Sequence, residues 1–354
     1  MGSANGLELR RLIEGFAGKT VLVVGDLVGD QYVFGKPARI SREAPVLILT
    51  YGSEELRLGG AANACHNLHS LGARVVPLGA VGDDGPGEGL RRLLEKVGIT
   101  SEGVVATPGR PTPVKTRIMA GGYRASRQQV VRVDREPAGA LPAPAEARLL
   151  ERLASWAPRA DAVVLSDYGY GTITPRLLAE VRGVAARGAV VTTDSRYDLL
   201  RFDGVTAATP NEPEVEQLLG VSLDGDKAVE EAGWRLLERL RTRLLLVTRG
   251  SRGLALFERG GGATFVPIYG SDEIADVTGA GDTVISTFTM ALTCGASPVD
   301  AARLSNYAGG LVVMKQGTAT VSRAELAEAV SRDAVHDVAH DAGGGGNDGH
   351  APGR

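Results

Sequence analysis

Cysteine is scarce in this sequence: Cys65 and Cys294 are the only two in 354 residues. Two cysteines are too few for a disulfide framework, and both lie within apolar patterns of helical spacing. We therefore expect buried, reduced thiols in a cytoplasmic protein. Long apolar runs are missing too, since no segment approaches the length of a membrane span and the N-terminal residues lack the apolar core of a signal peptide. We expect no membrane partner.

A surplus of basic residues is also absent. The chain has 39 Lys and Arg against 42 Asp and Glu, which gives a formal net charge of −3. Without a basic footprint we expect no nucleic-acid partner. Hydrophobic residues make up 43% and charged residues 23% of the chain, as in an ordinary globular protein. The length suits one large α/β domain or two smaller ones.

Short apolar runs alternate with helical patterns along most of the chain. Runs that end in Asp or in Thr-Arg-Gly predict buried strands at residues 20–26, 74–84, 161–167, 188–194 and 244–250. Helical patterns occupy residues 59–71, 87–97, 174–187, 211–219 and 226–241. This alternation predicts an α/β fold with a mostly parallel sheet and helices on both faces. Ligands of such folds bind at the carboxyl ends of the strands, where these Asp and Gly residues are expected.

Two stretches interrupt the alternation. Residues 31–51 and 112–134 contain extended patterns with turns, which predict a small β appendage. An appendage near the carboxyl ends of the strands would serve as a lid. The alternative is an insertion or a dimer surface, and a lid is compatible with a dimer surface.

The stretch ADVTGAGDTVIST, residues 275–287, places Gly279, Ala280 and Gly281 directly before Asp282, at the start of a helical pattern. A helix begins with unpaired N–H groups and partial positive charge, and small residues let an anion approach them. Asp282 at such a site suits a general base for a hydroxyl that attacks a phosphate. The alternative is that Thr278 or Asp282 only caps the helix. This stretch alone does not decide between them.

Three other polar motifs have structural alternatives of the same kind. In LGGAANA, Gly59 and Gly60 permit close backbone approach and Asn63 suits a sugar hydroxyl, as do Asp26 and Asp30, but a helix start and turns explain them equally. In TPNEPE (209–214), a metal–phosphate site competes with an ordinary helix cap. In TRGSRG (248–253), a nucleotide-binding turn competes with a hairpin turn.

In combination these motifs are more specific. GGAANACHNLHSLGARVVPLGAVGDDGPG (59–87) and DVTGAGDTVIST (276–287), with TPNEPE and TRGSRG between them, resemble the ribokinase-like (PfkB) carbohydrate kinases over residues 18–330. The resemblance implies a ribokinase-like α/β fold with a small β lid, and a kinase domain at residues 18–332. An N-terminal helix or extension at residues 1–17 would precede it. The Gly-rich residues 333–354 are expected to be a disordered tail.

The resemblance also implies a role for each motif. Asp282 would be the catalytic base, and Gly279, Ala280 and Gly281 would form the anion hole. The residues implied to contact ATP phosphates and Mg²⁺ are Asn211, Glu212, Pro213 and Glu214, with Glu214 on the metal side. Those implied to border the nucleotide are Thr248, Gly250, Gly253 and Asn306. Those implied to hold the sugar are Asp30, Gly59, Gly60 and Asn63.

Four further segments narrow the resemblance within the family: GDLVGDQYVFGKPARISREAPVLIL (25–49), RQQVVRVDRE (127–136), LSDYGYG (165–171) and KQGTATVSRAEL (315–326). They are similar to kinases that convert D-glycero-β-D-manno-heptose 7-phosphate to the 1,7-bisphosphate at the anomeric hydroxyl. Tyr170 stands where those kinases tend to carry Lys, and Asp194-Ser195-Arg196 where they favour Asp-Pro-Lys. Thr287 replaces a small residue. Arg196, Lys115 or Arg117 would then bind the 7-phosphate.

The sequence therefore predicts an ATP- and Mg²⁺-dependent kinase of a small sugar phosphate. We expect it to work without an attached adenylyltransferase and to form a homodimer through the lid. Two alternatives stay open: a kinase of the same family for another sugar, and a non-catalytic sugar or nucleotide sensor. An NAD-dependent oxidoreductase is excluded because Val284 stands where a dinucleotide fingerprint needs its third glycine.

Overall fold

A nine-stranded sheet forms the centre of the protein. The structure, a computed structural model, describes residues 5–121, 128–270, 276–315 and 317–343. In spatial order the strands are β13 (Ala263–Val266), β12 (Leu254–Glu258), β11 (Leu244–Thr248), β10 (Ala207–Ala208), β9 (Val190–Ser195), β8 (Ala162–Asp167), β1 (Thr20–Gly25), β4 (Arg74–Gly82) and β5 (Val104–Thr107). Only the β11–β12 and β12–β13 pairs are antiparallel. The predicted mostly parallel sheet is confirmed.

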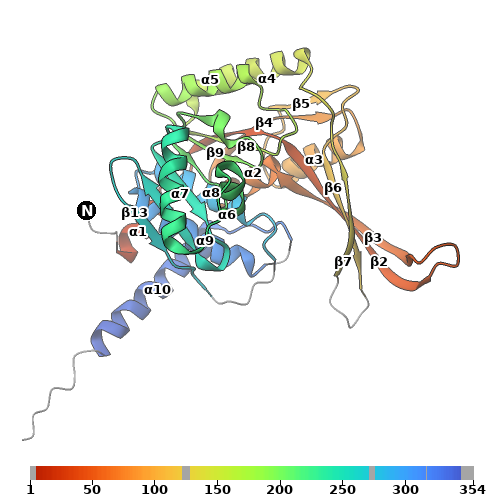
Figure 1. Ribbon diagram of the computed structural model, residues 1–354. Coiled ribbons are helices and arrows are strands. Elements are labelled where there is room, and N and C mark those ends of the chain that lie inside the picture. Colours follow the sequence, from red (N-terminus) through yellow and green to blue (C-terminus); the bar gives the residue numbers. More distant parts are fainter. Residues whose placement is uncertain (1–4, 122–127, 271–275, 316, 344–354) are drawn as a thin grey trace, which may run out of the picture.

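Helices cover both faces of this sheet (Figure 1). They are α1 (Gly6–Glu14), α2 (Ala61–Ser70), α3 (Gly85–Lys96), α4 (Ala143–Trp156), α5 (Pro175–Ala186), α6 (Glu212–Leu219), α7 (Gly225–Leu240), α8 (Ala280–Thr293), α9 (Pro298–Val313) and α10 (Arg323–Gly343). Helices α4 and α5 pack in one buried apolar cluster, α6 and α7 in a second, and α1, α2, α8 and α9 in a third. The helices predicted from the pattern are all present, with shifts of a few residues at their ends.

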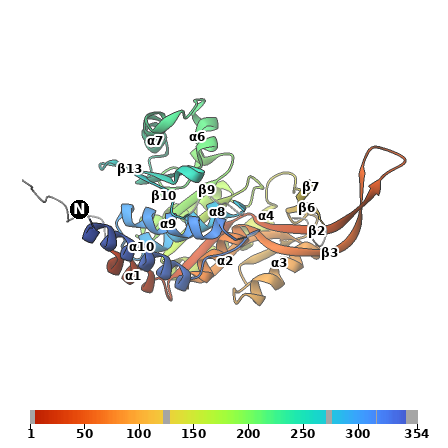
Figure 2. The same ribbon diagram turned by 90° about the horizontal axis from the view of Figure 1, so that it is seen from below.

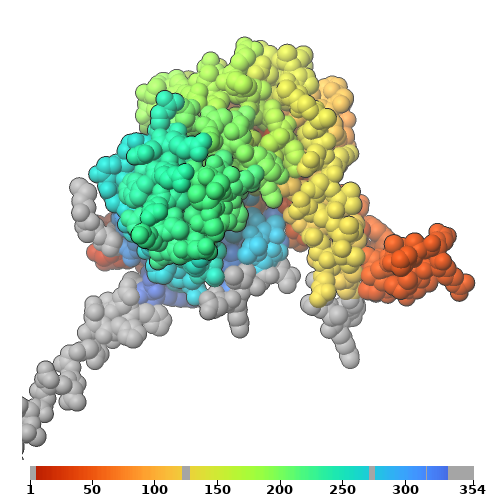
Figure 3. Space-filling view, in the orientation of Figure 1, coloured from red at the N-terminus to blue at the C-terminus, as the bar shows by residue number. Residues whose placement is uncertain are grey.

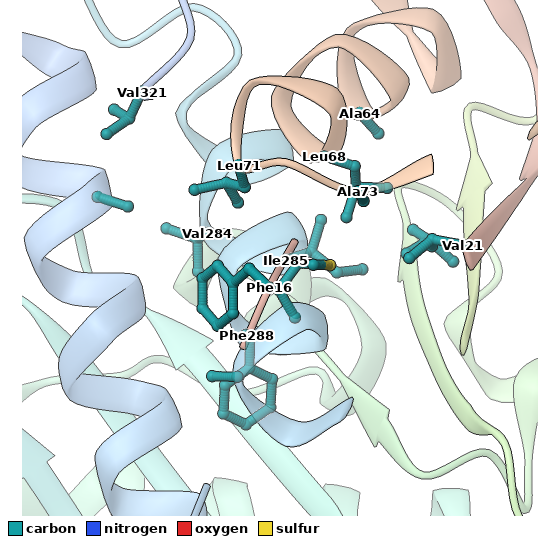
Figure 4. Close-up of a cluster of buried hydrophobic side chains, with 14 of the residues drawn as sticks. Phe16, Val21, Ala64, Leu68, Leu71, Ala73, Val284, Ile285, Phe288 and Val321 are labelled. Atoms are coloured by element: carbon teal, nitrogen blue, oxygen red, sulfur yellow. The ribbon is translucent and has the colours of Figure 1, made fainter. Parts of the chain in front are cut away.

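The third cluster fixes the position of α8. Ile285 and Phe288 of this helix pack beside Leu68 of α2 and Phe16, which follows α1 (Figure 4). All four side chains are fully buried or nearly so. Because protein cores are close-packed, this contact holds the first turn of α8 rigidly at the carboxyl ends of the strands.

Four strands form a separate lid sheet in the order β3–β2–β6–β7. They are β2 (Leu27–Ile40), β3 (Leu47–Gly60), β6 (Val114–Ala120) and β7 (Gln128–Arg135). The hairpin of β2 and β3 projects far from the body of the molecule, as Figures 2 and 3 show. The small β appendage expected at residues 31–51 and 112–134 is thus present, although residues 122–127 lie outside the described part of the chain.

Two expectations from the sequence need correction, one for the C-terminal residues and one for the burial of Cys294. Helix α10 continues to Gly343, where a disordered tail was expected from residue 333, and residues 344–354 lie outside the described residues. Cys65 is buried as expected, but Cys294 is only partly buried. Among the described helices, none combines the length and the apolar character needed to cross a membrane.

Candidate active site

A polar cavity of about 250 Å³ lies where β8, β9, β10 and β11 end. The first turn of α8 closes one side of it. Its lining residues are Asp167, Tyr168, Asp194, Arg196, Thr209, Asn211, Glu214, Thr248, Val277, Gly279, Gly281 and Asp282. Residues predicted from separate motifs, some of them more than 80 positions apart in the chain, therefore meet in one place. The location agrees with the rule that open α/β sheets bind ligands at their carboxyl edge.

The first turn of α8 has no side-chain cap. Its N-cap is Gly279, in the left-handed region with φ of 80°, and no side chain accepts a hydrogen bond from the turn. A Cβ at this position would come within 2.6 Å of Asn63 Nδ2, so only glycine fits. The alternative in which Thr278 or Asp282 caps the helix is not observed. The helix presents its N-terminal dipole and the small residues 279–281 to the cavity, which suits an anion.

Asp282 is buried at the mouth of this turn, with 4% of its surface exposed. Its Oδ2 accepts a hydrogen bond from Asn63 Nδ2 at 2.7 Å, and its Oδ1 accepts one from the Tyr168 hydroxyl at 3.3 Å. Burial raises the pKa of Asp282 to about 7, although the two hydrogen bonds act in the opposite direction. A carboxyl group with a pKa near neutrality can accept a proton and release it again.

A buried chain of amides and hydroxyls supports Asn63. Asn67 Nδ2 donates to the carbonyl of Asn63 at 3.0 Å, and Thr283 Oγ1 donates to Asn67 Oδ1 at 2.7 Å. The network joins α2 to α8. Asn63 was predicted to hold the sugar, which stays a prediction; in the structure its amide donates to the carboxylate of Asp282.

Two more carboxyl groups, those of Asp194 and Glu214, line the same cavity. Burial raises the pKa of Asp194 well above its usual value, and the nearby charges of Glu214 and Asp282 act in the same direction. Burial also raises the pKa of Glu214. The Arg196 guanidinium acts against both shifts. This crowding of carboxyl groups favours a bound cation.

The donor set suits Mg²⁺ carried by a nucleotide better than a metal held by protein alone. In the described ranges, no group of three or more His, Cys, Asp or Glu could hold a metal ion. Glu214 Oε2 accepts the backbone N–H of Asn211 at 2.9 Å, so this carboxylate retains its other oxygen for the cavity. Mg²⁺ is commonly bound through one or two carboxylates, water and substrate phosphates, and these residues fit that pattern.

A second cavity, of about 150 Å³, adjoins the first and shares Thr248, Val277 and Gly281 with it. Its walls are mainly apolar. The lining residues are Thr248, Gly250, Gly253, Leu254, Ile268, Val277, Ala280, Gly281, Val284, Ser305, Asn306, Gly309, Gly310 and Val313. All four residues predicted to border the nucleotide are among them. Asn306 also has a structural task, since its Nδ2 donates to the carbonyl of Pro267 at 2.7 Å.

Glu212 and Pro213, which were predicted to contact ATP, line neither cavity. Glu212 is buried and forms an ion pair with Arg249, with 2.9 Å between Oε1 and Nε, and a second pair with Arg252. It therefore holds the turn at residues 250–252 in place. Pro213 occupies the first turn of α6, where proline is favoured. Their predicted contact with ATP is not seen in the cavity linings.

The predicted sugar-binding residues cluster where the lid joins the body. Asp30 forms a buried ion pair with Arg117, which occupies that guanidinium. A Cβ on Gly59 would lie 2.7 Å from Asp30 Oδ2, and one on Gly60 would lie 2.7 Å from the carbonyl oxygen of Asp26, so close packing requires both glycines. The four residues predicted to hold the sugar do not line the polar cavity; they are Asp30, Gly59, Gly60 and Asn63. Lys115 of the lid sheet has its Nζ 4.9 Å from the centre of the ring of Tyr168, which does line the cavity.

Asp26 binds backbone and not ligand. Its carboxylate accepts the backbone N–H groups of Tyr168, Tyr170 and Thr172 at 2.9, 3.0 and 3.1 Å. The role in hydroxyl binding considered for Asp26 is therefore replaced by the structural alternative. Asp26 fixes the loop that follows β8 and carries Tyr168.

The positions that depart from the heptose kinase pattern have local partners. The Tyr170 hydroxyl donates to Glu136 at 3.1 Å. Ser195 Oγ donates to Asp167 at 2.7 Å. Thr287 Oγ1 donates to the carbonyl of Thr283 at 2.9 Å, within α8. Arg196 is exposed on the cavity rim.

Tyr168, Asp194 and Thr209 line the cavity but were not predicted as site residues. Asp194 ends one of the runs recognised as buried strands, and Tyr168 directly follows another, so the strand ends were the available signal. Nothing in the local sequence distinguishes them from turn residues.

Comparison with known proteins agrees with this geometry. A model of the pfkB family carbohydrate kinases matches residues 19–325, which is most of the chain. The chain belongs to the pfkB family. It is a carbohydrate kinase, and hence a phosphotransferase. The alternative of a non-catalytic sensor is set aside.

Relatives in sequence are longer than this chain. It is 42% identical over 307 residues to the bifunctional protein HldE of Geobacter sulfurreducens, covering 86% of this chain and 61% of that protein. It is 40% identical over 323 residues to the bifunctional protein HldE of Gluconacetobacter diazotrophicus, covering 90% of this chain and 65% of that protein.

Solved structures share the fold at lower identity. Arabidopsis thaliana ribokinase in complex with ribose and ATP matches 89% of this chain and 99% of its own, with a TM-score of 0.68 and 20% identity. Escherichia coli phosphofructokinase-2 in complex with substrates and products has the same coverage, a TM-score of 0.71 and 17% identity. Together they confirm the ribokinase-like α/β fold with its lid sheet.

Proposed function

We propose that this kinase transfers the γ-phosphoryl group of Mg–ATP to the anomeric hydroxyl of D-glycero-β-D-manno-heptose 7-phosphate. The observation that supports this proposal most directly is the position of Asp282. It lines the polar cavity at the uncapped start of α8, and the same turn also borders the apolar cavity. One helix terminus therefore faces an acceptor site and a nucleotide site together. The similarity to HldE proteins supports the choice of sugar.

The chemistry follows from this arrangement. Asp282 accepts the proton of the acceptor hydroxyl, and the hydroxyl oxygen forms a bond to the γ-phosphorus. The bond from that phosphorus to the bridging oxygen breaks, and ADP leaves with the electron pair. The N–H groups of Gly279 and Gly281 stabilise the charge on the transferring group. The predicted third donor, Ala280, instead binds the carbonyl of Val277 at 3.2 Å. The pKa of Asp282, about 7, lets the group act as a base at neutral pH.

The nucleotide occupies the apolar cavity in this proposal. Gly250 and Gly253 let its base and ribose approach the backbone, while Thr248 and Asn306 provide polar contacts at the rim. Asn211 and Glu214 face the phosphates from α6. Mg²⁺, when bound with ATP, neutralises charge on the β- and γ-phosphate oxygens.

Lys115 and Arg196 are the proposed anchors for the 7-phosphate of the acceptor. Lys115 is buried, and burial together with the charge of Arg196 lowers its pKa. An anion bound by both cations would offset this repulsion. Arg117 is a weaker candidate because Asp30 already neutralises it. Asp30, with Gly59 and Gly60 behind it, is left to accept hydrogen bonds from sugar hydroxyls.

An acceptor panel tests the proposal. ADP release is measured with Mg–ATP and either D-glycero-β-D-manno-heptose 7-phosphate, sedoheptulose 7-phosphate, fructose 6-phosphate, fructose or ribose. We expect strong preference for the heptose phosphate. We also expect Lys115→Met to raise KM for it at least about tenfold with little change for ATP, since a charged hydrogen bond is lost. Lys227→Met, an exposed change on α7, is the matched control. Preference for another acceptor would refute the heptose assignment and leave the kinase in place.

We further propose that the lid sheet mediates a homodimer. Its outer residues include a set of exposed apolar side chains: Ile40, Val46, Leu47, Tyr51, Val130, Val131 and Val133. A solvent-exposed apolar surface of this kind favours association with a second copy. Sedimentation at micromolar concentration should show a dimer, and Val131→Asp with Val133→Asp should give monomers. A monomeric wild-type protein would refute this assignment.

A further inference from the structure

Asp282 is held by two donors that come from different parts of the fold. Asn63 belongs to α2 and binds Oδ2, and Tyr168 lies in the loop after β8 and binds Oδ1. We propose that Tyr168 is a positioning residue for phosphoryl transfer: its hydroxyl fixes the carboxylate of Asp282 so that a free lone pair faces the acceptor hydroxyl. This inference rests on the proposed role of Asp282 as the base.

The loop that carries Tyr168 is unusually well fixed for a surface connection. Asp26, buried at the end of β1, accepts three of its backbone N–H groups. Gly169 and Gly171 have φ values of 78° and 82°, which allow the tight backbone path between these contacts. A side chain mounted on such a loop has little freedom to move. The carboxylate of Asp26 therefore acts on Asp282 through Tyr168, although the two carboxylates share no hydrogen bond.

The ring of Tyr168 is held from the lid side. Lys115 of β6 places its ammonium 4.9 Å from the ring centre, a favourable cation–π distance. Burial and the charges of Asp282, Asp194 and Asp30 raise the pKa of the Tyr168 phenol well above its usual value. The phenol therefore remains protonated at neutral pH. It can donate to Asp282 and cannot replace it as a base.

Several charged and titratable groups act on Asp282 besides Tyr168. They are Asp30 from β2, Lys115 from β6, Asp194 from β9 and the Cys65 thiol from α2. Removing the Tyr168 hydroxyl changes none of them, but it removes one of the two hydrogen bonds that favour the ionised carboxylate. The pKa of Asp282 should then rise further above its usual value.

The test compares Tyr168→Phe with Tyr170→Phe, which removes a phenol from the same loop whose partner is Glu136. For Tyr168→Phe we expect kcat at pH 7 to fall about 10- to 100-fold, the loss of one hydrogen bond to a charged group. In the pH profile of kcat, the midpoint of the acid limb should move to higher pH by as much as about one unit. The KM for ATP should stay within about twofold of the wild-type value. Tyr170→Phe should keep the wild-type limb.

A second variant removes any dependence on how well the Phe variant folds. Incorporating 3-fluorotyrosine at position 168 keeps the ring and strengthens the hydroxyl as a donor. The acid limb should then move to lower pH, opposite to the Phe variant. If neither variant moves the limb relative to wild type, the proposal is wrong.

Asp282→Asn separates this inference from the function on which it rests. An active Asp282→Asn variant would remove the proposed base, and with it the role of Tyr168. An inactive Asp282→Asn variant combined with an unchanged Tyr168→Phe variant would overturn the role of Tyr168 alone.

Discussion

Helices α6 and α8 begin at the same edge of the sheet, and their first turns are built from similar sequences with opposite results. In each helix an acidic residue stands three positions after the N-cap: Glu214 in α6 and Asp282 in α8. In α6 the cap is Asn211, whose side chain accepts the N–H of Glu214 while Glu214 accepts the N–H of Asn211, both at 2.9 Å. This capping box satisfies the N–H groups of Asn211 and Glu214 within the protein.

In α8 the cap is Gly279, which has no side chain to offer, and the shorter side chain of Asp282 turns outward to Asn63 and Tyr168. The N–H of Ala280 donates to the carbonyl of Val277 at 3.2 Å, but no side chain accepts a hydrogen bond from this turn, which leaves its other donors for a ligand. The comparison shows that an acidic residue near a helix start is structural where the cap is complete and available for chemistry where the cap is missing. In the sequence, this difference is visible as Asn211 at the N-cap of α6 and Gly279 at the N-cap of α8.

Replacing the carboxylate of α8 is the strongest way to break the comparison. Asp282→Asn keeps the shape of the side chain but removes the base, so kcat should fall by about 10²- to 10⁴-fold with the KM for ATP little changed. Steady-state kinetics and nucleotide binding measured on the same preparation provide the check. Retention of most of the wild-type turnover would mean that another group takes the proton.

The same variant should be more stable than the wild type at high pH. The pKa of Asp282 in the folded protein, about 7, lies above its value in the unfolded chain. The folded state therefore binds the proton more tightly. Its contribution to stability is fully present below about pH 4 and is lost as pH rises through about 7. Thermal unfolding at pH 5 and pH 8 should show the advantage of Asp282→Asn growing with pH, and a gap that shrinks with pH would contradict the shift.

Adding a Cβ at the N-cap of α8 should have the next largest effect. Gly279→Ala introduces a Cβ within 2.6 Å of Asn63 Nδ2 and strains a left-handed residue by about 1–2 kcal/mol. Because Asn63 holds Asp282, kcat should fall about 100-fold, as for other small displacements of a catalytic group. Gly220→Ala at the end of α6 has φ of 64° and meets nothing within 4 Å. It is the matched control, with similar strain and normal kcat; equal kcat losses in both variants would point to strain alone.

The open turn also predicts the pH dependence of the wild type. Only the ionised form of Asp282 can accept a proton, so kcat should rise with pH and level off above about 7. Below that value activity should fall about tenfold per pH unit. Profiles of kcat at saturating Mg–ATP and acceptor would check this, and a limb near pH 4 would show that the carboxylate keeps an ordinary pKa in the complex.

Local sequence patterns predicted part of the fold and of the candidate site, and contacts between distant segments account for the rest. The alternation of apolar runs was sufficient for β1, β4, β8, β9 and β11, and the polar residues at strand ends indicated the cavity, because both follow from local periodicity and from the geometry of parallel strands. The remaining strands of the sheet, β5, β10, β12 and β13, were not among the predicted runs. Pairings across the fold were not predictable. Asp26 binds the loop after β8, and Asn63 binds Asp282 across 219 positions of sequence. Which of two possible partners a polar side chain takes depends on packing that no single segment encodes.

Removing the side-chain cap of α6 should have the smallest effect. It is also the most precise test of the comparison between the first turns of α6 and α8. Asn211→Ala removes the side-chain half of the capping box and should lower the free energy of unfolding by about 1 kcal/mol. Ser297→Ala removes a similar cap from α9, away from the cavities, and should cost a similar amount. Only Asn211→Ala should also raise the KM for Mg–ATP a few-fold, because the released Glu214 lies in the polar cavity. If both variants lose stability and neither changes KM, the cap of α6 is structural alone, and the proposed contact of this helix with the phosphates fails.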